Sequence, residues 1–249
     1  MKKLSILFGT IISVVLLSLF MQSFKAEPKN MNRLIDLSHV IEDGMITYKG
    51  LPAPIICDYL SREESKKRYD PGTEFQIGKI EMVSNTGTYI DCPFHRYADG
   101  QDLSEVGVER FAELEGIVIQ VDLKNGSGIG KEVFEGLKLK DKAVLVNTSW
   151  SKHWRTDAYF ENHPFLTEET AIYLRDEGVK LVGIDSHNID DTKIKSRPVH
   201  TTLLKAGVLI VEHLCNLDQI PKGKFVFNAV PPKFKGVGTF PVRAYARML

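Results

Sequence analysis

Apolar and polar positions after residue 32 repeat with two different periods, which predict strands and helices. Alternating or continuous apolar runs bounded by turn residues predict strands. These runs cover residues 33–41, 54–60, 75–85, 117–123, 141–150, 179–186, 208–214, 224–231 and 240–249. Helical patterns are clearest over 167–178, where Thr167 is a suitable N-cap and Gly178 follows the last turn, and shorter ones occur at 107–116, 130–137 and 201–207. Strands outnumber helices and the two alternate, so we expect a single α/β domain with a mixed β-sheet flanked by helices.

The first 26 residues differ from the rest of the chain. Lys2 and Lys3 precede the uncharged, mostly apolar run 4–24, which is the pattern of a secretory signal peptide. The run is also long enough to span a bilayer, so an uncleaved membrane anchor is the alternative to a cleaved signal. Either way we expect an exported protein, periplasmic or extracellular, whose folded domain covers residues 32–249.

Composition narrows the classes of partner. The formal net charge of the 249-residue chain is zero, and no long basic block indicates nucleic-acid binding, so a small molecule is the expected partner. The segment 126–131, GSGIGK, lacks the context of a phosphate-binding loop and is expected to be a surface turn. Cys57, Cys92 and Cys215 are odd in number and widely spaced, so they imply no disulfide framework and leave any single pairing open.

Candidate chemistry lies in two distant segments. Asp91 and His95 fall in the stretch 84–100, SNTGTYIDCPFHRYADG, whereas His200 and Glu212 lie more than a hundred residues later. Carboxylate and imidazole side chains together suit a Zn²⁺ or Mn²⁺ ion. Taken alone, the same residues also allow a structural interpretation, in which Asp91 caps a turn and His95 is a buried, hydrogen-bonded ring.

Longer stretches of the chain resemble the cyclase family of metal-dependent hydrolases, which includes bacterial kynurenine formamidase and isatin hydrolase. The family signature, His-x-Gly-Thr-His-x-Asp-x-Pro-x-His, aligns with residues 85–95, and the likeness extends over nearly all of 32–249. It is also carried by segments 34–48, 144–154, 163–186 and 200–217. The resemblance implies the swivelling β/β/α cyclase-like fold, a metal-dependent hydrolase and a homo-oligomer.

The resemblance also implies a role for each residue that matches the signature. Asp91 would be a metal ligand shared between two ions, and His95 would be the catalytic acid and base. His200 would bind one ion, and Glu212 would bind or bridge both. Asn85 and Tyr89 stand where the signature has histidines.

Asn85 and Tyr89 alter the expected metal site. An amide oxygen is a weak neutral ligand, and a tyrosine binds such metals well only as phenolate, with an ordinary pKa near 10. We therefore expect one degraded metal position and one intact position with three protein ligands, which leaves a coordination site open for catalysis.

Other residues near these segments are expected to have no catalytic role. Cys92 and His95 are three residues apart on an extended chain and should face opposite ways, which argues against a Cys–His nucleophile. His213 should point away from Glu212 for the same reason. Asp190 is expected to be a turn residue.

These observations predict a metal-dependent hydrolase that cleaves a formamide, amide or cyclic amide C–N bond in a small molecule, in the manner of an arylformamidase. One zinc or manganese ion would activate water, and His95 would transfer the proton. The alternatives are a lactone hydrolase of the same fold and a small-molecule-binding protein that has lost turnover. Metal occupancy distinguishes the enzyme from the binding protein.

Overall fold

The computed structural model describes residues 33–123 and 127–249. The predicted signal peptide or anchor, residues 1–26, lies outside the described residues. Within the described ranges, none of the helices combines the length and apolar character needed to cross a bilayer.

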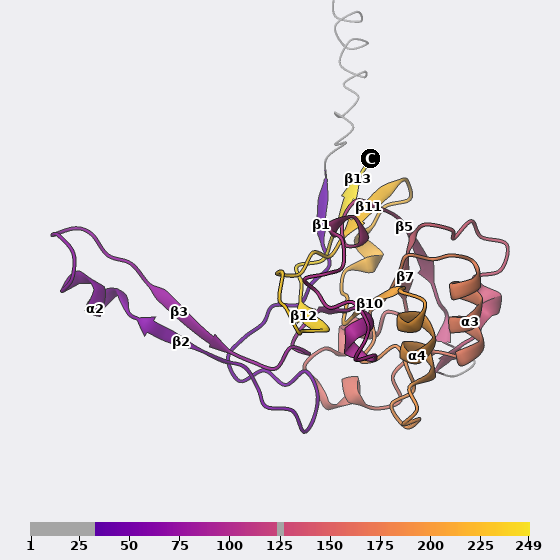
Figure 1. The fold of residues 1–249 in the computed structure, drawn as a ribbon, viewed down its shortest axis with the longest axis horizontal. Coiled ribbons are helices and arrows are strands. Elements are labelled where there is room, and N and C mark those ends of the chain that lie inside the picture. Colours follow the sequence, from indigo (N-terminus) through magenta and orange to yellow (C-terminus); the bar gives the residue numbers. More distant parts are fainter. Residues whose placement is uncertain (1–32, 124–126) are drawn as a thin grey trace, which may run out of the picture. The chain divides into compact units, whose positions relative to one another are not determined.

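A nine-stranded mixed sheet forms the centre of the domain (Figure 1). Its strands, in spatial order, are β1 (Leu34–Asp36), β13 (Tyr245–Met248), β11 (Phe225–Asn228), β5 (Leu114–Gln120), β7 (Ala143–Asn147), β9 (Leu181–Ile184), β10 (Leu209–Glu212), β4 (Tyr89–Asp91) and β12 (Thr239–Pro241). The four strands from β5 to β10 in that order are parallel, and the strands on both sides pair antiparallel. The predicted single α/β domain with a mixed sheet is confirmed.

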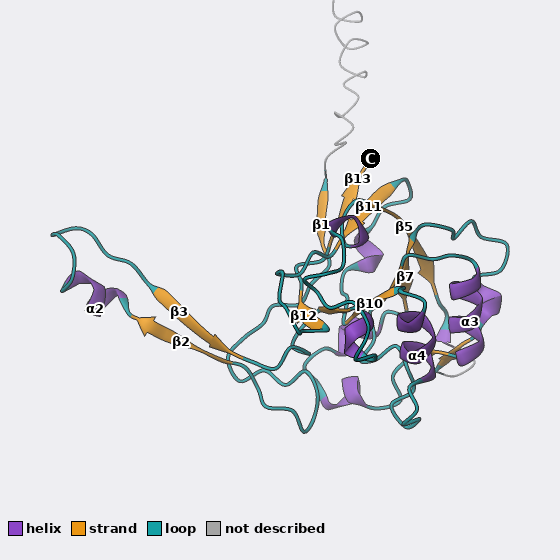
Figure 2. Ribbon diagram, viewed as in Figure 1, coloured by secondary structure: helices purple, strands orange, loops and turns teal. Residues whose placement is uncertain are grey.

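Both faces of the sheet are buried, as continuous apolar parallel strands require. Helices α3 (Glu168–Asp176) and α4 (Pro198–Lys205) pack together against one face (Figure 2), where alternate side chains of β7, β9 and β10 join them in one apolar cluster. The intervening side chains of the same strands pack on the other face with residues from β4, β11 and the loop that follows β4. Thr167 caps α3 by accepting a hydrogen bond from the backbone N–H of Thr170, as the sequence predicted.

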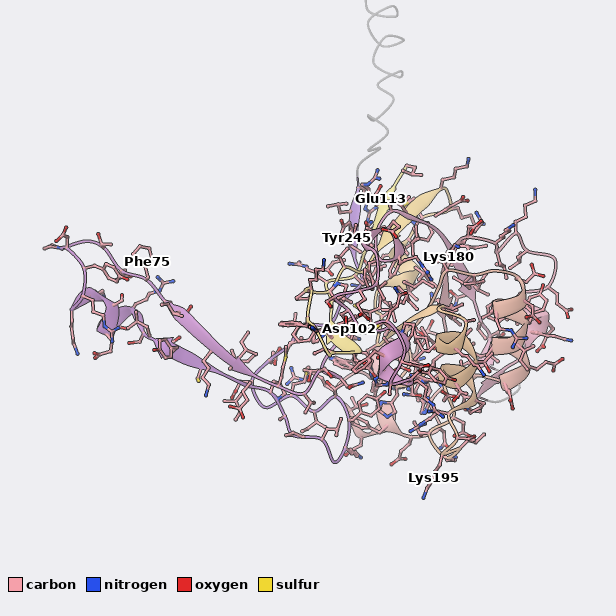
Figure 3. All side chains as sticks on the ribbon, viewed as in Figure 1. Phe75, Asp102, Glu113, Lys180, Lys195 and Tyr245 are labelled. Carbon is pink, nitrogen blue, oxygen red and sulfur yellow. The ribbon has the colours of Figure 1, made fainter. Side chains whose placement is uncertain are left out.

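A two-stranded hairpin extends away from this sheet (Figure 1). It consists of β2 (Ile55–Leu60) and β3 (Ile77–Glu81), with the short helix α2 (Arg62–Lys66) in the connection. Phe75 lies well out along it (Figure 3). A separate parallel pair joins β6 (Gly128–Ile129) to β8 (Phe165–Leu166).

Two of the short predicted helices are wrong. Residues 107–116 form only a 3₁₀ turn, Val108–Arg110, before β5 begins at Leu114. Gly116 therefore lies inside a strand and does not end a helix. A Cβ at that position would lie 2.0 Å from the Phe225 ring, so glycine is needed there for close packing. Residues 130–137 likewise form a single 3₁₀ turn, Lys131–Val133.

Candidate metal centre and active site

Strand order brings the two distant segments together. β4 and β10 are antiparallel neighbours in which Asp91 lies opposite Ile210 and Glu212 lies opposite Tyr89. Asp91 and Glu212 therefore lie diagonally across this pair, two register positions apart, and both carboxylates are fully buried. His200 projects from α4 toward the same point. The sequence placed His200 before a short helix, which is wrong, because α4 already begins at Pro198.

His200 lies close to both carboxylates, and the ligand atoms of Asp91, His95 and His200 all lie within 4.8 Å of one another. The Nε2 atom of His200 lies 3.6 Å from Oδ2 of Asp91 and 3.7 Å from Oε1 of Glu212. Ligands of a tetrahedral ion with bonds of about 2.0–2.2 Å are roughly 3.3–3.6 Å apart. Oδ2 of Asp91 is buried without a hydrogen-bond partner, a costly condition that a cation would relieve. The residues present therefore fit a divalent metal.

Asp190 orients His200 from the other side of the ring. Its Oδ2 lies 2.6 Å from Nδ1 of His200, and its two carboxylate oxygens also accept hydrogen bonds from the backbone N–H groups of Val199 and His200. In the neutral ring that a metal requires, this arrangement keeps the proton on Nδ1 and directs the Nε2 lone pair toward Asp91 and Glu212. The prediction that Asp190 is a turn residue is thus wrong in its role, since Asp190 both caps α4 and holds the imidazole.

The electrostatics of the cluster follow from burial and charge. Burial alone would lower the pKa of His200, but its hydrogen bond to Asp190 and the nearby carboxylates of Asp91 and Glu212 raise that pKa to about 10. Burial alone would raise the pKa of Asp91, but the imidazoles of His95 and His200 outweigh it and the pKa is lowered. Burial raises the pKa of Glu212, opposed by the charge of His200. Positive charge is therefore stabilised where the three side chains meet.

His95 lies on the pocket side of Asp91 and is linked to it through Thr239. Nδ1 of His95 is 2.7 Å from the Thr239 hydroxyl, which in turn donates to Oδ1 of Asp91. Because the ionised carboxylate can only accept, the threonine proton points toward Asp91 and its lone pair accepts from Nδ1–H of His95. Nε2 of His95 is then unprotonated in the neutral ring and free to act as a base.

Tyr89 lies beside Glu212, and Asn85 lines the same pocket. The hydroxyl of Tyr89 donates to Oε2 of Glu212 and lies 2.9 Å from the hydroxyl of Tyr48. Burial, reinforced by the charge of Glu212, raises the pKa of both phenols well above the ordinary value. Both tyrosines are therefore neutral hydrogen-bonding groups here.

These side chains open into a pocket of about 300 Å³. Besides the residues already described, its lining includes Leu51, Asn188, Arg96 and Arg197. Arg96 donates to the Thr201 hydroxyl and Arg197 to the Asp191 backbone oxygen, and in the described part of the chain neither forms an ion pair with a carboxylate. The pocket rim is therefore cationic.

Two residues near the cluster take no part in it. Cys92 is fully buried in the apolar core, and burial raises the pKa of its thiol to about 11, which disfavours a thiolate nucleophile. His213 points away from Glu212 and bonds the Tyr159 hydroxyl through Nδ1 at 2.8 Å. All three cysteines are free thiols.

Besides the two arginines of the rim, sequence reasoning missed the roles of Tyr48, Asn188, Asp190 and Thr239. Tyr48 and Thr239 come from loop or edge positions far from the signature, and nothing in their local sequence marks them. Asp190 and Asn188 lie in a polar run after β9, at the carboxyl end of a parallel strand. That position is where α/β sheets place functional groups, and it is the one signal that could have found them.

A mixed α/β sheet that ends in a buried Asp–His–Glu cluster, beside a histidine base and an open pocket, defines the class of metal-dependent hydrolases. The comparisons with known proteins agree. The model of the family described as "Putative cyclase" matches residues 35–191, and the chain belongs to this family.

Relatives and solved structures support the same class. The chain is 29% identical over 214 residues to kynurenine formamidase of Bacillus cereus, covering 86% of this chain and 96% of the relative. It is 28% identical over 218 residues to that of Bacillus anthracis, covering 87% and 98%. A structure named "The Structure Of Potential Metal-Dependent Hydrolase With Cyclase Activity" superposes with a TM-score of 0.71 at 26% identity, covering 88% of this chain and 98% of that one. Isatin hydrolase A from Labrenzia aggregata shares the fold, with a TM-score of 0.74 at 22% identity and coverage of 92% and 98%. The chain is therefore a hydrolase by family.

Proposed function

We propose that this protein is an arylformamidase-like hydrolase that cleaves the C–N bond of a small formamide, amide or cyclic amide. Asp91, His200 and Glu212 would hold one divalent ion, zinc or manganese. The observation that carries the proposal is the position of Nε2 of His200, 3.6 Å from the unpartnered Oδ2 of Asp91 and 3.7 Å from Oε1 of Glu212. The kynurenine formamidases among the relatives support the formamide as the substrate class.

A divalent ion held by these residues would supply Lewis-acid chemistry for the acyl oxygen and for the attacking water. His95 takes the proton of the attacking water on Nε2 and then donates it to the departing nitrogen, which leaves as a neutral amine. Thr239 accepts from Nδ1–H of His95 and keeps Nε2 directed to the pocket. Asp190 keeps the proton of His200 on Nδ1 throughout.

The pocket rim favours an anionic substrate. Arg96 and Arg197 carry two positive charges at the mouth, while Glu212 is the single acidic residue among the described residues that line the pocket. Arg197 also holds a left-handed backbone conformation, φ 49°, at the start of α4, which costs a non-glycine residue about 1–2 kcal/mol. We therefore propose that the substrate carries a carboxylate beside the acyl group, which the guanidinium groups bind.

We also propose that the protein forms a homo-oligomer through the β2–β3 hairpin. An isolated two-stranded hairpin is at best marginally stable, and large exposed apolar patches mark interaction surfaces. The exposed apolar side chains of the hairpin are Ile55, Ile56, Tyr59, Tyr69, Phe75, Ile77 and Ile80. Ile56 and Ile80 are directly opposite each other across the two strands. The I56K/I80K double variant should reduce the mass measured by light scattering, whereas V108K, at an exposed site outside the hairpin, should not. A monomeric wild type would overturn this assembly.

The proposed hydrolase is tested by metal content and turnover on the purified protein. We expect about one zinc or manganese per chain by elemental analysis, lost in H200A. In H95Q the metal should remain while hydrolysis of an aryl formamide falls by about 10²–10⁴-fold. Folded wild-type protein that holds no metal and cannot be loaded would refute the mechanism. Turnover of lactones with no turnover of formamides would reassign the bond that is cleaved.

A further inference from the structure

The two oxygens of Glu212 lie in different surroundings. Oε1 is 3.7 Å from Nε2 of His200 and accepts a hydrogen bond of 2.6 Å from the backbone N–H of Ile189. Oε2 turns the other way. It accepts from the Tyr89 hydroxyl, with the Tyr48 hydroxyl at 3.2 Å and Nδ2 of Asn188 at 3.3 Å. One edge of the carboxylate is thus directed to the metal site, and the other is covered by neutral donors.

The hydroxyl protons of this cluster can be assigned. The Glu212 carboxylate only accepts, so the single proton of Tyr89 points to Oε2. The Tyr48 hydroxyl accepts from Nδ2 of Asn188 at 2.8 Å, and its own proton is shared between Oε2 of Glu212 and the backbone oxygen of His187, 2.9 Å away. Donors therefore crowd the side of Oε2, where a second cation would need lone pairs.

The fold holds both phenols in place. Tyr89 is 1% exposed within β4, two residues before Asp91 in the same strand. Tyr48 comes from the loop before the hairpin, and its ring packs on the rings of His187 and His213 at centroid distances of 4.5 and 5.5 Å. Both tyrosines line the pocket. The hydroxyl pair is therefore a rigid part of the site.

We propose that the Tyr48 and Tyr89 hydroxyls are positioning groups that occupy the outer edge of Glu212, direct Oε1 alone to the ion, and limit the centre to one metal. This inference rests on the proposed metal site. It assigns Tyr89 a positive role in the centre, in which its hydroxyl takes the place that a second cation would otherwise fill.

The test measures zinc stoichiometry by elemental analysis and zinc affinity by competition with a chromophoric chelator. We expect Y89F to keep one ion per chain but to weaken zinc binding by about 10–100-fold, the usual effect of removing a group that orients a ligand. Y48F should weaken it less, because its hydroxyl is farther from Oε2. The matched control is Y159F, which removes a buried hydroxyl bonded to His213 and not to Glu212. Zinc affinity of Y159F should equal that of the wild type.

The second part of the test is a variant that is expected to bind an additional metal ion. The N85H/Y89H variant replaces the hydroxyl of residue 89 and places two imidazoles beside the same pocket. We expect its stoichiometry to rise from one zinc toward two, with circular dichroism confirming that it is folded. Should N85H/Y89H fail to fold, the Y89F and Y48F affinities still decide the outcome.

The outcomes separate this inference from the proposed function. One ion per wild-type chain, bound equally well by Y89F, Y48F and Y159F, would overturn the inference and leave the hydrolase intact. Two ions in the wild type, or one in a folded N85H/Y89H, would overturn the one-ion limit alone. A wild type that binds no zinc would overturn the proposed function and the inference with it.

Discussion

Asp190→Asn tests whether a buried carboxylate, and not only the three proposed ligands, maintains the proposed metal site. Asp190 is fully buried and accepts three hydrogen bonds: from the backbone N–H of Val199 at 2.7 Å, from the backbone N–H of His200 at 3.0 Å and from Nδ1 of His200 at 2.6 Å. An asparagine offers one oxygen and one NH₂ group in the same space, so it cannot satisfy all three donors.

Both orientations of the new amide carry a cost. With its oxygen toward His200, the NH₂ group opposes the N–H of Val199, and one buried donor is unpaired. With its oxygen toward Val199, the NH₂ group donates to Nδ1 and forces the proton of His200 onto Nε2, which removes the lone pair that would bind the ion. We expect a loss of about 1–3 kcal/mol in the free energy of unfolding for the unpaired donor. Zinc affinity should fall by about 10–100-fold, or roughly 1.4–2.8 kcal/mol.

The assay pairs a urea titration of the metal-free protein with zinc competition against a chelator. Asp185→Asn is the matched control, because Asp185 is 1% exposed and also accepts three hydrogen bonds, two from Thr148 and one from Trp150, none involving His200. D185N should lose stability comparably and keep wild-type zinc affinity. A folded D190N that binds zinc as tightly as the wild type would refute the reasoning.

Three further changes test the position of His95, the pocket rim and the buried histidines. Gly238→Ala places a Cβ 2.3 Å from the backbone nitrogen of His95. We therefore expect the free energy of unfolding to fall by about 1–3 kcal/mol and kcat to fall with it. An unchanged kcat would contradict the packing argument. Arg197→Gln should raise KM for a carboxylate-bearing N-formyl substrate roughly tenfold while a neutral analogue is unaffected, and equal effects on both would exclude charge recognition. Burial lowers the pKa of His39 to about 4 and of His187 to about 3, so the unfolded chain binds more protons below pH 6.5, and stability should fall as pH decreases from about 6.5 to 4. Urea titrations should show a loss of roughly 2 kcal/mol or more between pH 7 and 5, partly restored in H39Q, and a flat profile would show that these rings are protonated in the fold.

The sequence by itself determined the elements that depend on near neighbours. Apolar runs located the strands at the centre of the sheet, and Thr167 with Gly178 marked both ends of α3, because caps and periodicity are set by residues within a turn or two. The sequence likewise identified Asp91, His200 and Glu212 as candidate metal ligands, from their side-chain chemistry and from the resemblance to the family.

At one strand, close packing between distant residues made the prediction from the sequence pattern wrong. Gly116 looked like a helix stop, since a glycine that follows an apolar run usually ends one. In the fold it pairs with Ala143 and leaves room for the ring of Phe225, which is more than a hundred residues away in the chain. Only the tertiary structure shows that contact.

The arrangement of the site was also decided by tertiary structure. Thr239 reaches His95 across 144 residues because β12 pairs with β4, and Tyr48 reaches Glu212 across 164 because its loop folds over the end of β10. Such contacts depend on strand order and register, which leave no local pattern in the sequence. The sequence therefore shows which side chains can bind a metal. The fold decides which of their atoms lie close together, and which oxygen of Glu212 the two tyrosines cover.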